Sequence, residues 1–207
     1  MPVTEFALLR LRGGHDHLEF LETLMECQEL QDEWAHDNQP HNLESNSNLS
    51  SMYIEQSDPP SLLITAPWDS PEAHGEWIQC TENQMCNGKL SKYIAPGCSS
   101  VMLFHMDPAG KQPEMRTSFA PRGSFSVCRI TVNAGQRDSL QKAYQELEDR
   151  FLSKPGGQKV WAGWRIETSG DAQDFVVFWS DAVPDERMRR LMSFSGDKDH
   201  RHFKHVV

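Results

Sequence analysis

The chain has 207 residues, enough for one large domain or two small ones of about 100 residues each. Its apolar content of 38%, with six Trp and ten Phe, indicates a folded globular protein, and its formal net charge of -10 disfavours nucleic acid and anionic membranes as partners. The opening apolar run is too short and too charged for a signal peptide, and nothing later approaches the roughly 18 apolar residues that span a bilayer, so we expect a cytoplasmic protein with no membrane partner.

The first predicted element is a strand, FALLRLRG, in which Phe6, Leu8 and Arg10 alternate with small or apolar residues. A long amphipathic helix is expected next. Its apolar stripe is predicted to comprise Leu18, Leu21, Leu24, Met25 and Trp34. Its glutamates are expected to face solvent: Glu22, Glu26, Glu29 and Glu33.

A long polar loop, HDNQPHNLESNSNLSS, occupies residues 36–51. Loops longer than about 12 residues are uncommon, and this one is either a lid over a site or a tolerated insertion. Two further strands are predicted in SMYIEQS, which ends at Ser57, and in PSLLITAPW, which ends at Trp68. SSVMLFHM closes the half as another strand.

The second half repeats this order. FSVCRITV, residues 125–132, again places Phe, an aliphatic residue and Arg on one face of a strand. The helix that follows is predicted to bury Leu140, Ala143, Tyr144, Leu147 and Phe151, and it ends at a Pro-Gly-Gly breaker. The next predicted strand, GWRIETS, shares the pattern Ile-Glu-x-Ser with SMYIEQS of the first half. The strand after it, DFVVFW, corresponds to PSLLITAPW, and the half ends with a predicted strand in RHFKHVV. Trp161 and Trp164 stand three apart on a predicted strand, so they should point to opposite faces.

Each half therefore runs strand, helix, strand, strand, helix, strand, which is typical of a ferredoxin-like βαββαβ unit. We expect an α+β protein with a first unit over residues 1–106, a linker over 107–122 and a second unit over 123–207. A sheet with helices on one face leaves its other apolar face bare. A second copy on the same chain can cover that face, which predicts an intramolecular α+β barrel.

Arginine and glutamate recur at corresponding places in the two halves. Arg10 and Arg129 share strand faces with phenylalanines, and a partly buried guanidinium there would need a partner such as Glu55 or Glu167. We therefore expect the same structural ion pair to be built twice.

Signals for metals and cofactors are weak. Of the tail residues His200, His202 and His205, strand alternation places the third on the opposite face from the other two, and we interpret all three as solvated. His105 alternates with Leu103, so it faces either a cavity or a wet sheet edge, and a structural role is favoured.

The segment WDSPEAH reads as a strand end followed by a helix start. Ser70 can act as N-cap, Pro71 suits the first helical position, and Glu72 favours the positive end of the helix dipole. His74 then lies in the first turn, where the dipole disfavours the imidazolium, and a neutral imidazole can take a proton from an acidic phenol or β-dicarbonyl. Two interpretations stay open: His74 is a general acid/base beside a Trp68 wall, or His74 only packs at the helix start with Trp68 in the core.

The tandem units and the motif Trp-x-Ser-x-Glu-x-His resemble the dimeric α+β barrel superfamily, specifically antibiotic biosynthesis monooxygenase-like proteins of fungal type that hold two such domains in one chain. The similarity covers nearly all of the sequence. It implies a pocket protein that needs no cofactor and is often placed in secondary metabolism. Relatives include oxygenases that make quinones from polyphenols, haem-degrading enzymes and polyketide cyclases, so the resemblance predicts fold better than reaction.

In that family the corresponding region lies beside a cavity between sheet and helices. We expect His74 to be catalytic there, with substrate contacts from Trp68, Phe6, Leu8, His105, Trp77 and Tyr53. The implied ligand is a small hydrophobic or aromatic, polyketide-like molecule, and the reaction is a cyclisation, an isomerisation or a monooxygenation with dioxygen, with no cofactor and no metal. A non-catalytic binding or carrier protein and a haem-degrading monooxygenase are the alternatives.

The second half departs from the motif. Aligning Pro184 with Pro71 places Arg187 where His74 stands, and arginine cannot shuttle protons at neutral pH. The second half is therefore either structural, which we favour, or binds an anionic group through Arg187. The tandem arrangement suits a monomer, and exposed strand edges would suit a homodimer.

Overall fold

The computed structural model describes residues 1–207 except 40–48, 114, 116–122, 154–158 and 169. Most of the lid candidate and half of the expected linker therefore lie outside the described residues. Contacts divide the chain into two compact units, Met1–Leu103 with His205–Val207, and Phe104–Lys204. Each unit is described by itself below.

The first unit contains a small antiparallel sheet. Its strands are β1 (Val3–Arg10), β2 (Ser51–Glu55), β3 (Ser61–Thr65) and the two-residue β4 (Pro67–Trp68). They are paired in the order β2, β3, β1, β4. In register, Leu8 lies opposite Leu63, which lies opposite Tyr53, so these three side chains share one face. The alternate set, which includes Ala7, forms the face toward the helices.

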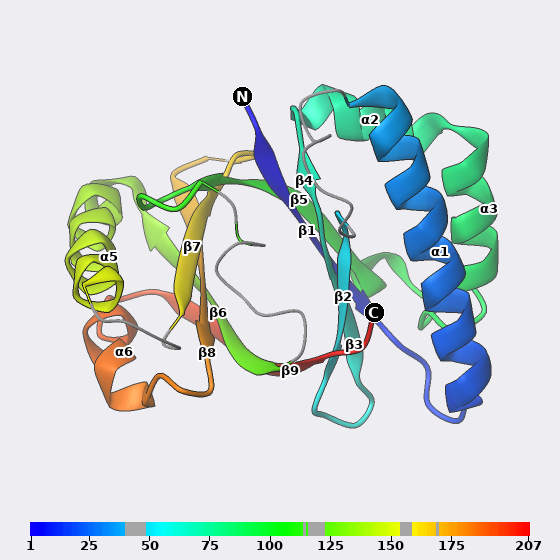
Figure 1. Ribbon diagram of the computed structural model, residues 1–207. Coiled ribbons are helices and arrows are strands. Elements are labelled where there is room, and N and C mark those ends of the chain that lie inside the picture. The colour runs from blue at the N-terminus through cyan, green and yellow to red at the C-terminus, as the bar shows by residue number, and fades with distance from the viewer. Residues whose placement is uncertain (40–48, 114, 116–122, 154–158, 169) are drawn as a thin grey trace. The chain divides into compact units, whose positions relative to one another are not determined.

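Three helices cover that face (Figure 1): α1 (His17–Asn38), α2 (Pro71–Gln79) and α3 (Thr81–Leu90). A short 3-10 turn, η2 (Cys98–Ser100), follows α3 in the chain. Helix α1 begins where it does because the Asp16 carboxylate accepts the backbone N–H groups of Leu18 and Glu19, both at 2.9 Å. The resulting core contains apolar residues of the sheet and of all three helices.

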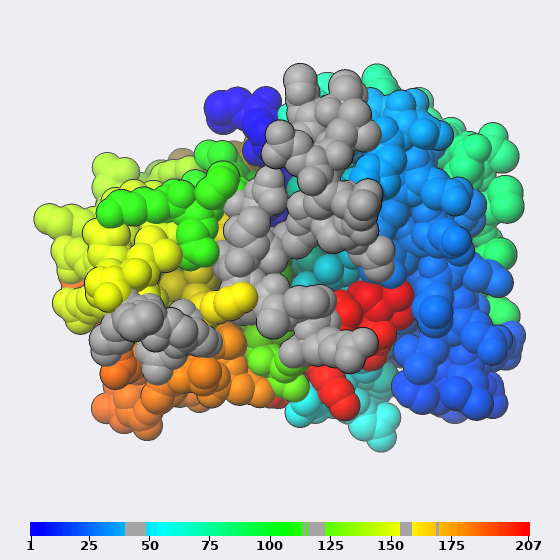
Figure 2. Space-filling model, viewed as in Figure 1, coloured from blue at the N-terminus to red at the C-terminus, as the bar shows by residue number. Residues whose placement is uncertain are grey.

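The expected stripe of α1 is partly wrong. Leu18 and Met25 are 71% and 60% exposed, because the buried face instead runs through Phe20, Leu24 and Cys27 at helical spacing. The four glutamates expected to face solvent are indeed exposed. Figure 2 shows the surface of α1 in blue along the outer side of the first unit.

The second unit has the element order βαββαβ. It comprises β6 (Ser124–Asn133), the 3-10 turn η3 (Ala134–Gln136), α5 (Arg137–Leu152), β7 (Val160–Arg165), β8 (Ala172–Ser180), α6 (Asp185–Met192) and β9 (Asp197–His205). A further strand, β5 (Val101–Pro108), starts in the first unit and pairs with β7 through residues 106–108. Within this unit the strands run in the antiparallel order β9, β6, β8, β7, β5.

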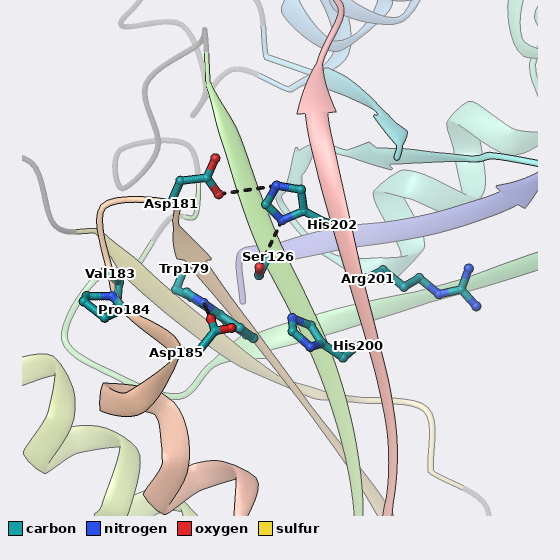
Figure 3. A pocket seen from close by; sticks show the side chains of 9 residues that line it. All are labelled: Ser126, Trp179, Asp181, Val183, Pro184, Asp185, His200, Arg201 and His202. Carbon is teal, nitrogen blue, oxygen red and sulfur yellow. Dashed lines mark hydrogen bonds and ion pairs between the residues drawn. The ribbon is translucent and has the colours of Figure 1, made fainter. Parts of the chain in front are cut away.

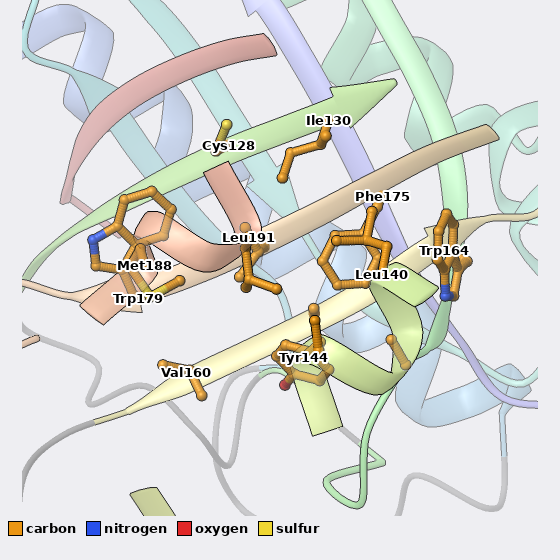
Figure 4. Close-up of a cluster of buried hydrophobic side chains, with 14 of the residues drawn as sticks. Cys128, Ile130, Leu140, Tyr144, Val160, Trp164, Phe175, Trp179, Met188 and Leu191 are labelled. Atoms are coloured by element: carbon orange, nitrogen blue, oxygen red, sulfur yellow. The ribbon is translucent and has the colours of Figure 1, made fainter. Parts of the chain in front are cut away.

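Helices α5 and α6 cover one face of this sheet (Figures 1 and 4). The expected helical stripe is confirmed: Leu140, Ala143, Tyr144 and Phe151 are buried in the core, and Leu147 packs against it. The two tryptophans of β7 do point to opposite faces, since Trp164 belongs to the helix-side core and Trp161 does not. Trp161 packs edge-on against Phe178, which lies opposite it on β8.

The expected ion pair of the second half is wrong. Arg129 lies 3.6 Å from Asp174 and 4.0 Å from Asp199, which faces it across the β6–β9 pair. Glu167 instead contacts His105. The reason is the strand order, because β8 lies between β6 and β7 and therefore separates Arg129 from Glu167. Arg10 is exposed rather than partly buried, and its pairing with a glutamate stays a prediction.

Both units contain an antiparallel sheet with helices, which confirms the predicted α+β class. The first unit departs from the six-element order through the extra strand β4 and the division of its second helix into α2 and α3. The closure of two ferredoxin-like units into one barrel stays a prediction. Across the described parts of the chain, no helix has both the length and the apolar character that crossing a membrane requires.

Candidate functional site

The sequence motif WDSPEAH folds as its residues predict. Strand β4 ends at Trp68, which lies opposite Val3 of β1, and Ser70 accepts the backbone N–H of Ala73 at 3.2 Å as the N-cap of α2. Pro71 is the first helical residue. The short connection therefore fixes where the side chain of His74 lies relative to the strand end.

His74, Trp68 and Glu5 form a buried contact group, which we call the Glu5 cluster. The Trp68 and His74 rings are stacked, with centroids 4.4 Å apart and an angle of 16° between planes. The indole N–H of Trp68 donates to Oε2 of Glu5 at 2.9 Å, and Nε2 of His74 lies 3.6 Å from the same oxygen. All three residues are at most 4% exposed.

Burial changes the proton affinity of this carboxyl group. It raises the pKa of Glu5 from 4.5 to about 7, against the opposing effect of the Trp68 hydrogen bond and of the Gln31 side chain. The group therefore exchanges its proton near neutral pH, 3.6 Å from Nε2 of His74. A carboxyl group of this kind beside an imidazole is suited to acid–base chemistry.

Aromatic rings surround the cluster on the helix side. The Trp34 ring lies 6.1 Å from that of Trp68 and 5.6 Å from that of Trp77, with each distance taken between centroids. Trp77 is 3% exposed. The carbonyl oxygen of the Gln39 side chain accepts the backbone N–H of Asp69 at 3.1 Å, which ties α1 to the start of the motif. The surroundings are thus apolar and firmly packed.

The structure brings together only part of the expected substrate-contact set. Trp77 lies with the Glu5 cluster in the helix-side core. Phe6, Leu8 and Tyr53 are buried but belong to the opposite face of the sheet by strand alternation and register. The Tyr53 ring packs edge-on against His205 with centroids 5.4 Å apart, and burial raises the pKa of its hydroxyl.

His105 lies in the second unit, apart from this set. Its Nδ1 is 2.5 Å from Oε1 of Glu167, and its backbone N–H donates to Oε2 of the same carboxylate at 3.0 Å. Although burial acts to raise the pKa of Glu167, these hydrogen bonds hold it below its usual range. His105 is thereby held in place by a carboxylate.

Sequence reasoning missed Glu5 and Gln31 as members of the site. A usable signal was present for Glu5, because strand alternation puts it on the same face as Val3 and Ala7. An acidic residue on an apolar strand face needs a hydrogen-bonding partner. Gln31 gave no comparable signal, since polar residues are ordinary on an amphipathic helix.

The second unit holds a pocket that the sequence did not predict. It lies beside the start of α6, has a volume of about 540 Å³, and is lined by residues that include Ser126, Trp179, Asp181, Asp185, His200 and His202 (Figure 3). As expected, His200 and His202 lie on one face of β9, opposite Cys128 and Ser126 of β6. His200 is exposed and His202 is half-buried, as solvated histidines would be, and each also contacts another side chain of the pocket. We call this cavity the second-unit pocket.

Arg187 is not among the residues that line this pocket. Its guanidinium lies 5.9 Å from the centroid of the Phe151 ring, between α6 and α5. Among the described residues, no group of three or more His, Cys, Asp or Glu side chains is arranged to hold a metal ion.

Comparisons with known proteins give a fold and no family. No protein-family model matches the sequence, and no curated protein matches it. A "putative monooxygenase" from Fusobacterium nucleatum subsp. nucleatum is similar in structure, with a TM-score of 0.66 and 6% identity over 100% of this chain and 93% of that chain. A second protein so described, from Lactobacillus acidophilus NCFM, has a TM-score of 0.62 at 10% identity over 100% and 94%.

An anthrone oxidase-like protein is also similar, with a TM-score of 0.59 and 12% identity over 100% of this chain and 92% of that chain. At such low identities the likeness shows the fold alone. The chain thus has, over its whole length, the fold of proteins described as monooxygenases and as anthrone oxidase-like.

Proposed function

We propose that the chain is a monooxygenase-like enzyme that binds a small aromatic or polyketide-like molecule and moves a proton through the Glu5 cluster. One observation carries this proposal: the carboxyl of Glu5, with a pKa raised to about 7, lies 3.6 Å from Nε2 of His74. A carboxyl group that titrates near neutral pH beside an imidazole can support both the acceptance and the return of a proton during turnover.

In this reaction His74 removes a proton from an acidic phenol or β-dicarbonyl, and Glu5 stabilises the imidazolium that forms. Stacking on Trp68 holds the imidazole ring in one plane, and Trp77 supplies an apolar wall. The resulting carbanion can cyclise, isomerise or react with dioxygen. The other expected substrate contacts do not belong to the Glu5 cluster. A ligand on the sheet face away from the helices could contact Phe6, Leu8 and Tyr53. His105 is a proposed contact only for a ligand bound in the second unit.

We also propose the finer fold and setting that the resemblance implied. The chain would be a single-chain dimeric α+β barrel of the fungal antibiotic biosynthesis monooxygenase-like type, acting in secondary metabolism. The repeated element order supports this, and the second unit supports it most directly through its βαββαβ order. The first substrates to test are tricyclic phenols of the anthrone kind, since one similar structure is described as anthrone oxidase-like.

The test is oxygen uptake and product formation with anthrone as the probe. His74→Ala should lower turnover by about 10² to 10⁴, the usual contribution of a general acid or base. His17→Ala is the matched control, because His17 is an exposed histidine at the start of α1 and should leave turnover unchanged. Unchanged turnover in a folded His74→Ala protein would remove the catalytic role.

A binding or carrier protein is the second candidate. The near-complete burial of the Glu5 cluster favours it, because a packed imidazole can serve as a hydrogen-bonding group without meeting a substrate. Saturable binding of the aromatic probe, without product and without oxygen uptake, would select this candidate. Haem-degrading activity is tested in the same series by mixing the protein with haem. A red-coloured complex would favour that activity.

A further inference from the structure

The second-unit pocket contains three polar side chains in successive contact, a serine, a histidine and an aspartate. Oγ of Ser126 lies 3.1 Å from Nδ1 of His202, and Nε2 of His202 lies 3.5 Å from Oδ1 of Asp181 (Figure 3). Ser126 and His202 face each other directly across the β6–β9 pair, and Asp181 follows the end of β8. The backbone of the sheet therefore fixes the serine and histidine relative to each other.

The carboxylate of Asp181 biases the tautomer of His202. Its negative charge lies 3.5 Å from Nε2 and favours the tautomer that carries hydrogen on that atom. Nδ1 is then an acceptor, and it can receive the hydroxyl hydrogen of Ser126. A hydroxyl bonded to an imidazole that is itself oriented by a carboxylate is the arrangement that activates a serine for nucleophilic attack.

The corresponding position of the first unit has no serine. Matching FALLRL with FSVCRI places Ala7 at the corresponding position of the first unit. Both positions point toward the helix side of their sheets, and Ser126 is 7% exposed. Alanine satisfies that packing in the first unit, so the hydroxyl adds a polar group that the fold does not demand.

Apolar and aromatic groups form the rest of the pocket. Val183 and Pro184 line it, and the Trp179 ring stacks on His200 with centroids 5.0 Å apart. The indole N–H of Trp179 donates to Asp185 at 3.2 Å, which fixes the ring as a wall. A flat acyl or aromatic group of modest size fits a cavity of about 540 Å³ with such walls.

The charged side chains of the pocket determine which substrate charge is favoured. Asp181, Asp185 and Arg201 line the pocket, but the guanidinium of Arg201 is held by both carboxylate oxygens of Asp199 at 2.9 and 3.1 Å and points away from Ser126 in Figure 3. The acidic side chains therefore outweigh the fixed positive charge. Anionic substrates are disfavoured, and a neutral one is preferred.

We propose that the second-unit pocket is an acyl-transfer site for small neutral esters, with Ser126 as nucleophile, His202 as base and Asp181 as a positioning residue. Oγ of Ser126 bonds to the acyl carbon as the ester C–O bond breaks. The serine proton passes to Nδ1 of His202 and then to the departing alcohol oxygen. Water then attacks the acyl carbon and gives its proton to His202, and Ser126 leaves with that proton restored, releasing a carboxylic acid.

The direct test uses the whole chain and needs no variant. A fluorophosphonate probe is incubated with the folded protein, and the labelled peptide is identified by mass spectrometry. Stoichiometric labelling of Ser126 is expected. Labelling confined to other serines, or none in excess probe, would overturn the proposal and leave the pair as a structural cross-strand contact.

Hydrolysis of p-nitrophenyl butyrate supplies the second measurement. Ser126→Ala should abolish labelling and hydrolysis above background. Asp181→Asn should lower the rate of hydrolysis by about 10-fold or more, because His202 would no longer be held in the tautomer that carries hydrogen on Nε2. Ser180→Ala is the matched control, because Ser180 ends β8 outside the lining of the pocket. His74→Ala should leave both readouts unchanged, which separates this site from the Glu5 cluster. Hydrolysis that persists in Ser126→Ala would refute the nucleophile.

Discussion

Replacing Glu5 by glutamine isolates the energetic cost of burying its carboxyl group. Glutamine keeps an oxygen that can accept the indole N–H of Trp68 and has nearly the same volume, but it does not titrate. The substituted protein therefore retains the packing of the cluster while losing its pH dependence. The comparison of the two proteins across pH cancels the contributions of other carboxyl groups.

The magnitude follows from the pKa. Burial raises the pKa of Glu5 from 4.5 to about 7, so the folded protein holds this proton to higher pH than the unfolded chain does. Its contribution to stability is fully present below pH 4.5 and is lost as the pH rises through 7. At 1.36 kcal/mol for each pH unit, the loss amounts to about 3 kcal/mol.

The assay is urea unfolding followed by tryptophan fluorescence, at a series of pH values from about 4.5 to 8. The free energy of unfolding of the original protein, minus that of Glu5→Gln, should fall by about 3 kcal/mol across this range. A difference that stays flat, or that rises with pH, would refute the argument that burial dominates the proton affinity of this group.

Two further predictions concern the second unit, with one control in the first. Gly110→Ala should lower the free energy of unfolding by about 1 to 3 kcal/mol, since an added Cβ would meet the buried carboxylate of Glu148, which is held by the backbone N–H groups of Lys111 and Gln112. Gly88→Ala on α3, where a Cβ meets nothing, should raise it by about 0.5 to 1 kcal/mol. Thermal unfolding measured side by side checks the pair, and an equal effect of both would contradict the packing argument. Asp174→Ala should cost about 1 to 3 kcal/mol because it removes the acceptor shared by Arg165, Arg129 and Thr131, and a denaturant midpoint that does not move would show that these contacts together are energetically silent.

Local chemistry in the sequence was sufficient to predict the start of α2. The order Ser70, Pro71 and then His74 encodes a cap, a first helical residue and a first-turn side chain, all within a few residues of each other. The repeated element order likewise depends on local periodicity. These features are predictable because neighbours along the chain determine them.

Contacts across the sheet were not predictable in the same way. The partner of Arg129 depends on which strand lies beside β6, and the sequence alone does not state the order of strands. The chain through Ser126 and Asp181 required the register of two strand pairs as well. Periodicity could place His202 on a face, but it could not say what that face would meet.

The two units fasten corresponding tryptophans in different ways. The acceptor for Trp68 is Glu5, on a strand of its own sheet, whereas the acceptor for Trp179 is Asp185, the first residue of an eight-residue helix. Helix ends fray more readily than paired strands. A brief unwinding of the first turn of α6 would therefore release the Trp179 indole, while the Trp68 indole would keep its anchor through any similar excursion of α2.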